Sequence, residues 1–321
     1  MNTKYFFRIS ICLSLLTLNS SLSTNAQTNP VSLSGLTEGQ KVNGFSTKAI
    51  YLNDAGQPMG GRFIHDRTGF ILDLLQIESV PQTFIWVNTF PVSDKGEPHT
   101  QEHLLITKGN KGHELNTREG MSIASSNAFT SQLHTAYHFY TGAGGKVFYN
   151  LFEGYIDALL HPDYTSEEVN REVRNWGVSE NPDKTLKIEE KGSVYNEMST
   201  SMNNPYSQLY NTMGRFVYGD AHPLSFSAGG LPSGIRELGA TEIQRFHDAN
   251  YHLWNMGAIT SLPKTMPLGS VLTETNNILN RLDPNPVKPG NNYNLKLPPA
   301  KPAEPGKIVM VDYPGSNEQE P

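Results

Sequence analysis

The sequence contains very little cysteine, because Cys12 is the only thiol among its 321 residues. Cys12 lies in a short apolar stretch that follows Lys4 and Arg8, a pattern typical of a secretory signal peptide. We expect cleavage after Ala26, so that 1–26 is the signal and the mature chain has no cysteine. Disulfides, thiolate metal sites and a cysteine nucleophile are thereby excluded, and any bound metal must use His, Asp or Glu.

The sequence also lacks clusters of basic residues and long apolar runs. Its formal net charge is -6 and no run of Lys and Arg offsets this acidity, which argues against a nucleic-acid partner. The apolar stretch of the signal is too short to span a bilayer as a mature helix. A lipid anchor on Cys12 is disfavoured because Ile11 precedes it. We therefore expect an exported protein, periplasmic or extracellular, with no stable membrane anchor.

Several segments have the pattern of strands. The segments 62–65, 70–77 and 83–90 alternate or are apolar, and turn residues separate them. The third contains Phe-Ile-Trp-Val, a β-branched and aromatic run that favours extended structure. The segment 122–139 alternates more loosely and is expected to form one or two further strands.

Other segments have the pattern of helices. Apolar residues recur at helical spacing over 146–160, which predicts a helix facing the core. Capping boxes at Thr165-x-x-Glu168 and Thr241-x-x-Gln244 predict the starts of two more helices. Strands interleaved with such helices indicate the α+β class rather than a barrel or a sandwich.

The composition also predicts how the chain is divided. Residues 27–45 are rich in Ser, Thr and Asn and are expected to be a flexible lead-in to an α+β domain over 46–265. The segment 266–305 is expected to hold a helix and a proline-rich, semi-rigid linker. The segment 306–321 contains Ile-Val-Met-Val and is expected to be the first strand of a second, truncated domain.

The motif with the most functional information is His99-x-x-Glu102-His103, which has the inverted H-x-x-E-H form of a zinc-peptidase signature. Pro98 suits the first turn of a helix that begins near His99. Residues four apart lie on one face of a helix, so both imidazoles can reach one ion. Glu102 lies beside them and need not be a ligand, because a free carboxylate there can accept a proton from a metal-activated water.

A catalytic zinc with two histidine ligands commonly takes a carboxylate as its third protein ligand. The segment 186–202 offers Glu190 and Glu197, which are two helical turns apart and can point the same way on a helix. Acidic residues on helices are usually only solvated, so the spacing alone leaves open whether either residue binds a metal.

Several motifs in the same order resemble the pitrilysin/insulinase family of inverted-motif zinc peptidases, above all its presequence protease branch. The motif at 99–103 is followed by Gly-Ser-Val-Tyr-Asn-Glu-Met at 192–198, and the segments 90–98 and 126–130 are similar to the family's sequence before and after the zinc helix. The resemblance runs over roughly 60–321. It implies a mixed sheet with helices packed on one face, followed by the start of a second, similar domain.

The resemblance also implies roles for individual residues. It assigns one zinc ion per chain to His99, His103 and Glu197. It makes Glu102 the general base. Glu190 matches the family's second acidic position, and a residue there is expected to support the ligands from behind.

Asn127 and Ala128 match the edge strand against which family members bind an extended peptide, a mode that reads backbone and predicts broad specificity. The implied function is a secreted or periplasmic zinc metalloendopeptidase that hydrolyses peptides or unfolded segments with a zinc-activated water. Members of this branch have two halves that enclose the substrate, and the sequence stops inside the second expected domain. It is therefore expected to be an N-terminal fragment that needs the missing C-terminal half, in cis or as a partner subunit in trans.

The alternative is a non-catalytic zinc-binding or peptide-binding subunit. The intact Glu102 favours the peptidase, whereas the missing second half favours the alternative for this polypeptide by itself.

Overall fold

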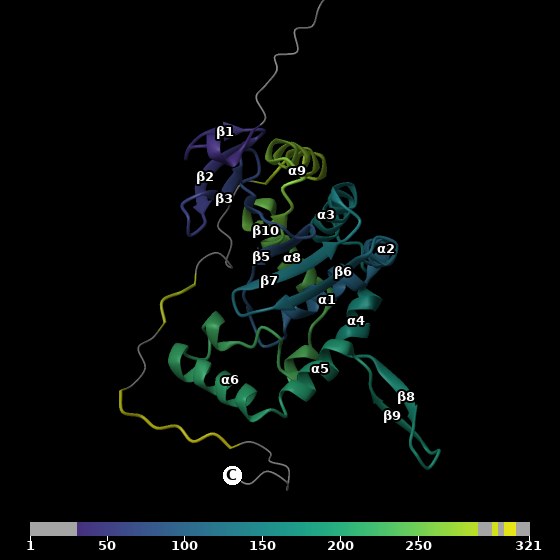
Figure 1. The fold of residues 1–321 in the computed structure, drawn as a ribbon. Helices are drawn as coiled ribbons and strands as arrows, with labels where there is room; N and C mark the ends of the chain where they lie inside the picture. The colour runs from purple at the N-terminus through teal and green to yellow at the C-terminus, as the bar shows by residue number, and fades with distance from the viewer. Residues whose placement is uncertain (1–30, 288–296, 301–304, 313–321) are drawn as a thin grey trace, which may run out of the picture. The chain divides into compact units, whose positions relative to one another are not determined.

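Eight strands form one mixed sheet in the computed structural model of this chain (Figure 1). The structure describes residues 31–287, 297–300 and 305–312. The strand order is β1-β2-β3-β4-β10-β5-β7-β6, and within the described residues β10 beside β4 is the one parallel pair. The strands are β1 (Lys41–Val42), β2 (Phe45–Leu52), β3 (Pro58–His65), β4 (Ile71–Gln76), β5 (Gln82–Asn88), β6 (Ala124–Thr130), β7 (His134–Thr141) and β10 (Met256–Leu262).

The predicted strands at 62–65, 70–77 and 83–90 are confirmed as β3, β4 and β5. The segment 122–139 folds as two antiparallel strands, β6 and β7, so the looser alternation there includes a turn. β6 is the outermost strand at its end of the sheet and pairs with β7. Its other edge is therefore not paired with any described strand.

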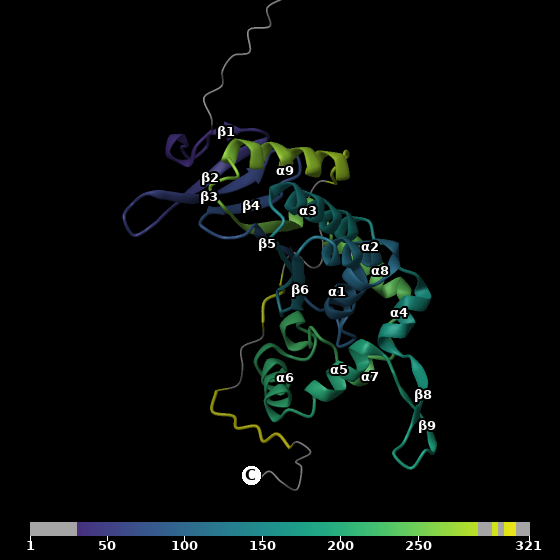
Figure 2. The same cartoon turned by 45° about the vertical axis from the view of Figure 1, so that its right-hand side comes forward.

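Helices cover one face of this sheet, and Figure 2 shows them lined up along it. The opposite face carries Phe84, Tyr140 and Ile259 on adjacent strands, and each remains at least 38% exposed. This arrangement confirms the predicted α+β fold with helices on one face. The helices that contribute to the main core are α1 (Glu97–Thr107), α2 (Gly109–Gly120), α3 (Gly145–Leu160), α8 (Ala240–Asn250) and α9 (Leu268–Leu282).

Helix α3 confirms the helix predicted over 146–160. Its apolar residues recur on one face and pack onto β7, where the ring of Phe139 stacks on Tyr155 with centroids 4.9 Å apart. Burying aromatic rings of this size contributes about 1.5–3 kcal/mol each. Helix α3 thus anchors the helical layer to the sheet, including the neighbouring α1 and α2.

A second, smaller apolar cluster lies beside α1 and away from the main core. It joins α1 to three helices from the middle of the chain, α4 (Ser166–Val173), α5 (Ser193–Ser201) and α7 (Pro232–Ile235). Its fully buried members are Leu104, Val169, Val173, Val194, Ile235, Leu238 and Ile243. Helix α1 is therefore held from two sides, which fixes its orientation.

The remaining elements project from this body. Strands β8 (Trp176–Glu180) and β9 (Leu186–Glu190) form a separate hairpin, and α6 (Pro205–Tyr218) has no buried residue. Short 3₁₀ turns lie at η1 (Leu33–Gly35), η2 (Pro223–Ser225) and η3 (Leu253–Asn255). None of the helices that the structure describes has both the length and the apolar character needed to cross a membrane.

The structure differs from the sequence predictions at both flanks of the domain. The flexible lead-in predicted over 27–45 is wrong for the described residues 31–45, because Leu33, Leu36 and Val42 are buried in the main core. Most residues of this segment are polar and its apolar residues are widely spaced, so the sequence pattern does not predict that they are buried. The strand predicted within 306–321 is not formed by the described residues 305–312, which pair with none of the described strands. The predicted signal over 1–26 lies outside the described residues.

The two predicted capping boxes also have different outcomes. Thr165 caps α4 as predicted, and its hydroxyl accepts from the Glu168 amide at 3.2 Å. The box predicted at Thr241 is wrong, because the N-cap of α8 is Gly239, two residues earlier in the chain. Glu242 accepts a hydrogen bond there from the Gly239 amide at 2.9 Å.

This difference predicts contrasting effects of two Thr→Ala substitutions. Thr165→Ala removes a cap and should lower the free energy of unfolding by about 1 kcal/mol. Thr241→Ala is the matched control, because Thr241 is exposed inside α8 and caps nothing, so its effect should stay within about 0.5 kcal/mol. Urea unfolding of both variants measures this, and equal losses would contradict the observed helix starts.

Candidate metal centre

Helix α1 presents the H-x-x-E-H motif, as the sequence predicts. Pro98 lies in its first turn, and Gly96 caps it with φ +75°. A side chain at Gly96 would place its Cβ 2.5 Å from the carbonyl oxygen of Gly229, so glycine is required for this close approach. The start of α1, next to His99, therefore packs directly against the loop that contains Gly229.

Three donor groups converge at this end of α1. Glu197 Oε1 lies 3.5 Å from His99 Nε2, and Glu197 Oε2 lies 3.6 Å from His103 Nε2. All three ligand atoms lie within 4.8 Å of one another, and no other group of three such donors is found within the described residues. The structure therefore brings together His99, His103 and Glu197, the three residues predicted to bind zinc.

The donor set fits zinc. Donors about 2 Å from a tetrahedral zinc lie roughly 3.3 Å apart, close to the two distances from Glu197. These separations are long for direct hydrogen bonds, which are normally about 2.7–3.2 Å. Two imidazole nitrogens with one carboxylate is also a ligand set found in catalytic zinc sites.

Glu197 reaches the histidines because α5 packs closely on α4. Gly192 caps α5, and a Cβ there would lie 2.8 Å from the carbonyl oxygen of Glu172. Val194 is fully buried in the second cluster and anchors the first turn of α5. The Glu197 side chain, one turn further, is 57% exposed and projects toward α1 from the opposite side.

Glu190 does not occupy the position that the sequence predicted. It ends strand β9, whereas Glu197 belongs to α5, so the assumed helical spacing of the two residues is wrong. Its carboxylate pairs with Arg236 at 3.3 Å, and the Arg236 guanidinium also stacks over the Tyr195 ring. This ion pair links the β8–β9 hairpin to the helices. It directs the Glu190 carboxylate to Arg236 and not to a proposed metal ligand.

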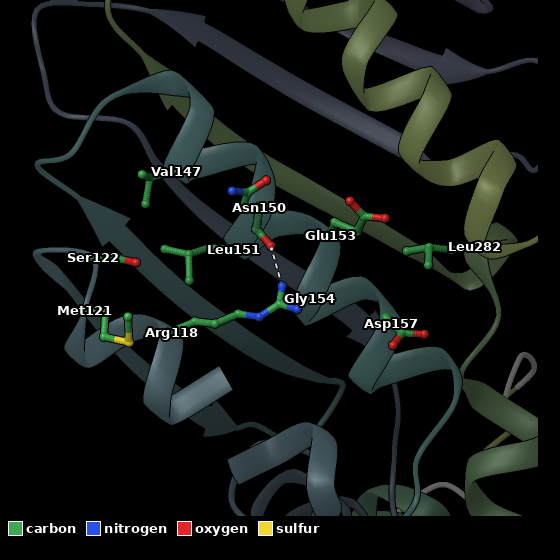
Figure 3. A pocket seen from close by; sticks show the side chains of 10 residues that line it. All are labelled: Arg118, Met121, Ser122, Val147, Asn150, Leu151, Glu153, Gly154, Asp157 and Leu282. Atoms are coloured by element: carbon green, nitrogen blue, oxygen red, sulfur yellow. Dashed lines mark hydrogen bonds between the residues drawn. The ribbon is translucent and has the colours of Figure 1, made fainter. Parts of the chain in front are cut away.

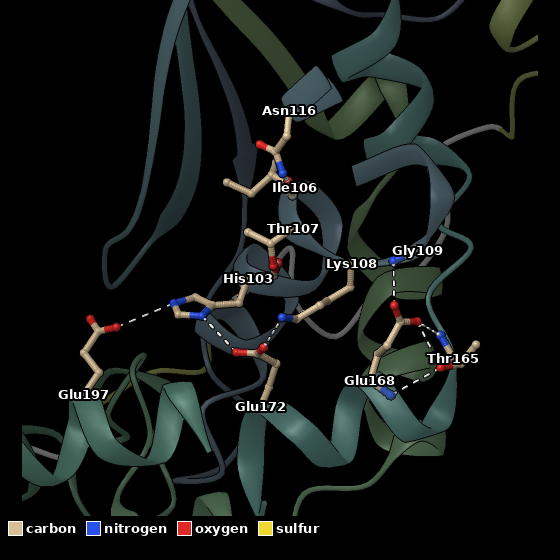
Figure 4. A network of polar contacts seen from close by, with 10 residues as sticks. All are labelled: His103, Ile106, Thr107, Lys108, Gly109, Asn116, Thr165, Glu168, Glu172 and Glu197. Carbon is tan, nitrogen blue, oxygen red and sulfur yellow. Dashed lines mark hydrogen bonds and ion pairs between the residues drawn. The ribbon is translucent and has the colours of Figure 1, made fainter. Parts of the chain in front are cut away.

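The residue behind the ligands is Glu172 of α4, which the sequence analysis missed (Figure 4). Its Oε2 lies 3.1 Å from His103 Nδ1, and its Oε1 accepts from Lys108 Nζ at 2.8 Å. A signal was present in the sequence. Glu172 shares the buried face of α4 with Val169 and Val173, and a carboxylate on an apolar helix face needs a partner.

The titration of the two histidines differs with their surroundings. Burial lowers the pKa of His99, and the neighbouring His103 lowers it further. Burial also acts to lower the pKa of His103, but its hydrogen bond to Glu172 and that residue's charge outweigh burial and raise it. Burial acts to raise the pKa of Glu172, yet hydrogen bonds from His103 and Lys108 lower it overall. Glu172 is thus held as an anion.

Glu102 lies beside the donors and has a different partner. Its Oε2 accepts a hydrogen bond from Thr130 Oγ1 at 2.6 Å. Burial raises the pKa of Glu102, although this hydrogen bond opposes the shift. A carboxylate with a raised pKa is a stronger base, which suits it to accept a proton near neutral pH.

Thr130 ends the edge strand β6, so the metal centre lies next to an unpaired strand edge. The predicted peptide-binding residues are on this strand, where Asn127 is exposed and Ala128 is half-buried. The Asn127 side chain accepts a hydrogen bond from the Ala128 amide at 2.9 Å. The structure thus places both residues beside the candidate centre, and their role in binding stays a prediction.

A separate hollow of about 620 Å³ lies between α2 and α3 (Figure 3). Arg118 crosses it and donates to the Asn150 carbonyl at 3.5 Å, and Glu153 and Asp157 line its rim. None of the predicted site residues lines this hollow. It is therefore distinct from the metal centre.

Comparison with known proteins supports the predicted relationship. No protein-family model matches the chain. It is 32% identical over 210 residues to protein HypA of Clostridium perfringens, a match covering 63% of this chain and 21% of HypA. It is 30% identical over 207 residues to the mitochondrial presequence protease of Gibberella zeae, covering 61% of this chain and 20% of the protease. The chain thus spans about a fifth of the length of the curated relatives it matches.

The fold is also that of a known peptidase. Pitrilysin superposes with a TM-score of 0.59 at 16% identity, over 85% of this chain and 26% of pitrilysin. The chain therefore has the α+β fold of pitrilysin. The relatives and the fold together support the predicted relationship to the pitrilysin/insulinase family, above all to presequence proteases, of which the chain spans about a fifth.

Proposed function

We propose that this chain carries the metal site of a zinc metalloendopeptidase that acts on peptides or unfolded segments. The observation that supports this most directly is that His99, His103 and Glu197 converge. Glu102 lies beside them and is not one of the converging donors. A metal-binding subunit without activity would not need a buried carboxylate with a raised pKa in that place. We also propose export to the periplasm or outside the cell from the pattern of 1–26, which N-terminal sequencing of the mature protein can test.

In this proposal the residues of the site have separate roles in metal binding, proton transfer and positioning. Zinc, when held by His99, His103 and Glu197, supplies Lewis-acid polarisation of a peptide carbonyl and activation of water. Glu102 accepts the proton of the attacking water and returns it to the leaving amine. Thr130 holds the Glu102 carboxylate in place by donating to Oε2, which leaves its Oε1 free for the proton.

The substrate is proposed to bind as an added strand. The outer edge of β6 offers backbone groups along Asn127 and Ala128, and the strand leads to Thr130 and hence to Glu102. Because backbone pairing is largely independent of side chains, it favours broad specificity for extended peptides. Folded proteins would not present a free strand to this edge.

Activity is proposed to need the part of the family protein that this chain does not include. Helix α6 exposes a row of apolar side chains, Tyr206, Leu209, Tyr210, Met213 and Val217, each at least 40% exposed. Such a row is typical of a surface that another part of a protein covers. Enclosure by that part would position the peptide and exclude water, which can lower the barrier by several kcal/mol.

We therefore expect the 321-residue chain to bind about one zinc ion but to hydrolyse peptides weakly, with activity rising when the distal half is supplied in cis or trans. Metal analysis and hydrolysis of an unstructured peptide, with and without that half, measure this. Equal rates would show that the domain is self-sufficient. Zinc binding without hydrolysis in both forms would favour the non-catalytic alternative.

A further inference from the structure

Two carboxylates of helix α4, one turn apart, contact the junction of α1 and α2 (Figure 4). Glu168 accepts from the Gly109 amide at 3.0 Å, at the start of α2. Glu172 contacts Lys108 Nζ at 2.8 Å and His103 Nδ1 at 3.1 Å. Both carboxylates thus stabilise the junction of α1 and α2, but only Glu172 contacts a proposed metal ligand, His103.

Glu172 is buried, and this determines which groups can interact with its carboxylate. The residue is 1% exposed, so its carboxylate relies on protein partners rather than on water. An ionised carboxylate only accepts hydrogen bonds, and the Lys108 ammonium only donates them. The atom of His103 that faces Glu172 must therefore carry a proton.

A neutral imidazole carries one proton, either on Nδ1 or on Nε2. Only the tautomer with its proton on Nδ1 has a lone pair on Nε2, the atom that lies 3.6 Å from Glu197 on the side of the other donors. We propose that Glu172 is a positioning residue that holds the proton on His103 Nδ1, orients the ring and leaves Nε2 free to bind the metal. This inference rests on the metal site proposed above.

Lys108 determines which oxygen of Glu172 faces His103. It occupies Oε1 of Glu172, so that Oε2 is the oxygen presented to His103. In Glu172→Gln the amide oxygen would face the Lys108 ammonium and the amide NH₂ would face His103 Nδ1. The ring would then move its proton to Nε2, where it blocks metal binding.

The test compares zinc affinity by chelator competition in four proteins. Glu172→Gln should bind zinc about 10–100-fold more weakly than the wild type. Lys108→Met combined with Glu172→Gln should recover most of this loss, because without the ammonium the amide can turn its oxygen toward His103. Glu168→Gln, a change of the same kind one turn away, should keep the wild-type affinity.

A second measurement needs no metal. Nitrogen-15 NMR of the metal-free proteins, at a pH where His103 is neutral, reports which ring nitrogen carries the proton. We expect Nδ1–H in the wild type and in the double variant, and Nε2–H in Glu172→Gln. This tautomer change would not follow from a general loss of stability.

The outcomes separate this inference from the proposed function. A wild-type chain that binds no zinc would overturn the metal site, while the tautomer comparison would still decide the role of Glu172. Wild-type affinity and an unchanged tautomer in Glu172→Gln would overturn the positioning role alone. Equal weakening in Glu172→Gln, Glu168→Gln and the double variant would also overturn it, since the effect would then be structural.

Discussion

Glu102→Gln should lower peptide hydrolysis by about 10²–10⁴-fold while zinc binding stays close to that of the wild type. Glutamine has nearly the same shape and can still accept the hydrogen bond from Thr130, but it cannot take a proton. Glu102 is not among the three donors that converge, so the ligand set is left intact. The measurement is hydrolysis by a competent form that includes the distal half, with zinc content determined on the same samples.

A control separates loss of the base from loss of a charge. Glu114→Gln changes a residue on the adjacent helix α2 that is exposed and paired with Arg118. This variant should retain activity, because surface ion pairs contribute little to stability. If Glu102→Gln loses its zinc, then Glu102 is a ligand and the proposed division of roles is wrong.

His103→Ala should weaken zinc binding by at least about a thousandfold. Two protein donors cannot complete the site, and the affinity of such sites depends on every donor being in place. Zinc at a thousandfold excess over its dissociation constant stabilises a folded protein by about 4.1 kcal/mol, so the wild type should show a clear rise in Tm when zinc is added. In His103→Ala this rise should disappear.

The matched control is His113→Ala, which removes an exposed histidine on α2 that is not among the convergent donors. It should keep both the zinc affinity and the rise in Tm. Full zinc occupancy in His103→Ala would refute the assignment of the site. Loss of zinc in both variants would point to unfolding, which circular dichroism of the metal-free proteins would reveal.

Features set by short-range spacing could be predicted from the sequence. The motif at His99 and His103 lies on one helical face because residues four apart always do. The helix α3 and the cap at Thr165 follow from local patterns as well, since their hydrogen bonds and apolar faces involve neighbours in the chain. The resemblance to a known family supplied Glu197, which spacing alone could not distinguish from Glu190.

Local patterns failed where contacts with distant segments decided the structure. Thr241 and Gly239 both offer a helix start, and the structure uses Gly239, where Glu242 is also held by Lys95 at 2.6 Å. The polar segment 31–45 shows no periodicity, yet four of its apolar residues are buried. In each case a contact with a distant segment decided the outcome.

The sequence by itself determined the class of fold and placed His99, Glu102 and His103 together on one helix, because these features depend on local geometry and on recognisable motifs. Only the tertiary structure decided that Glu172 stands behind His103 and that Glu190 does not. Residues 103 and 172 are distant in the chain, and their contact requires α4 to pack on α1 through buried Val169 and Val173. The direction of that packing is set by the whole apolar cluster, which no local pattern encodes.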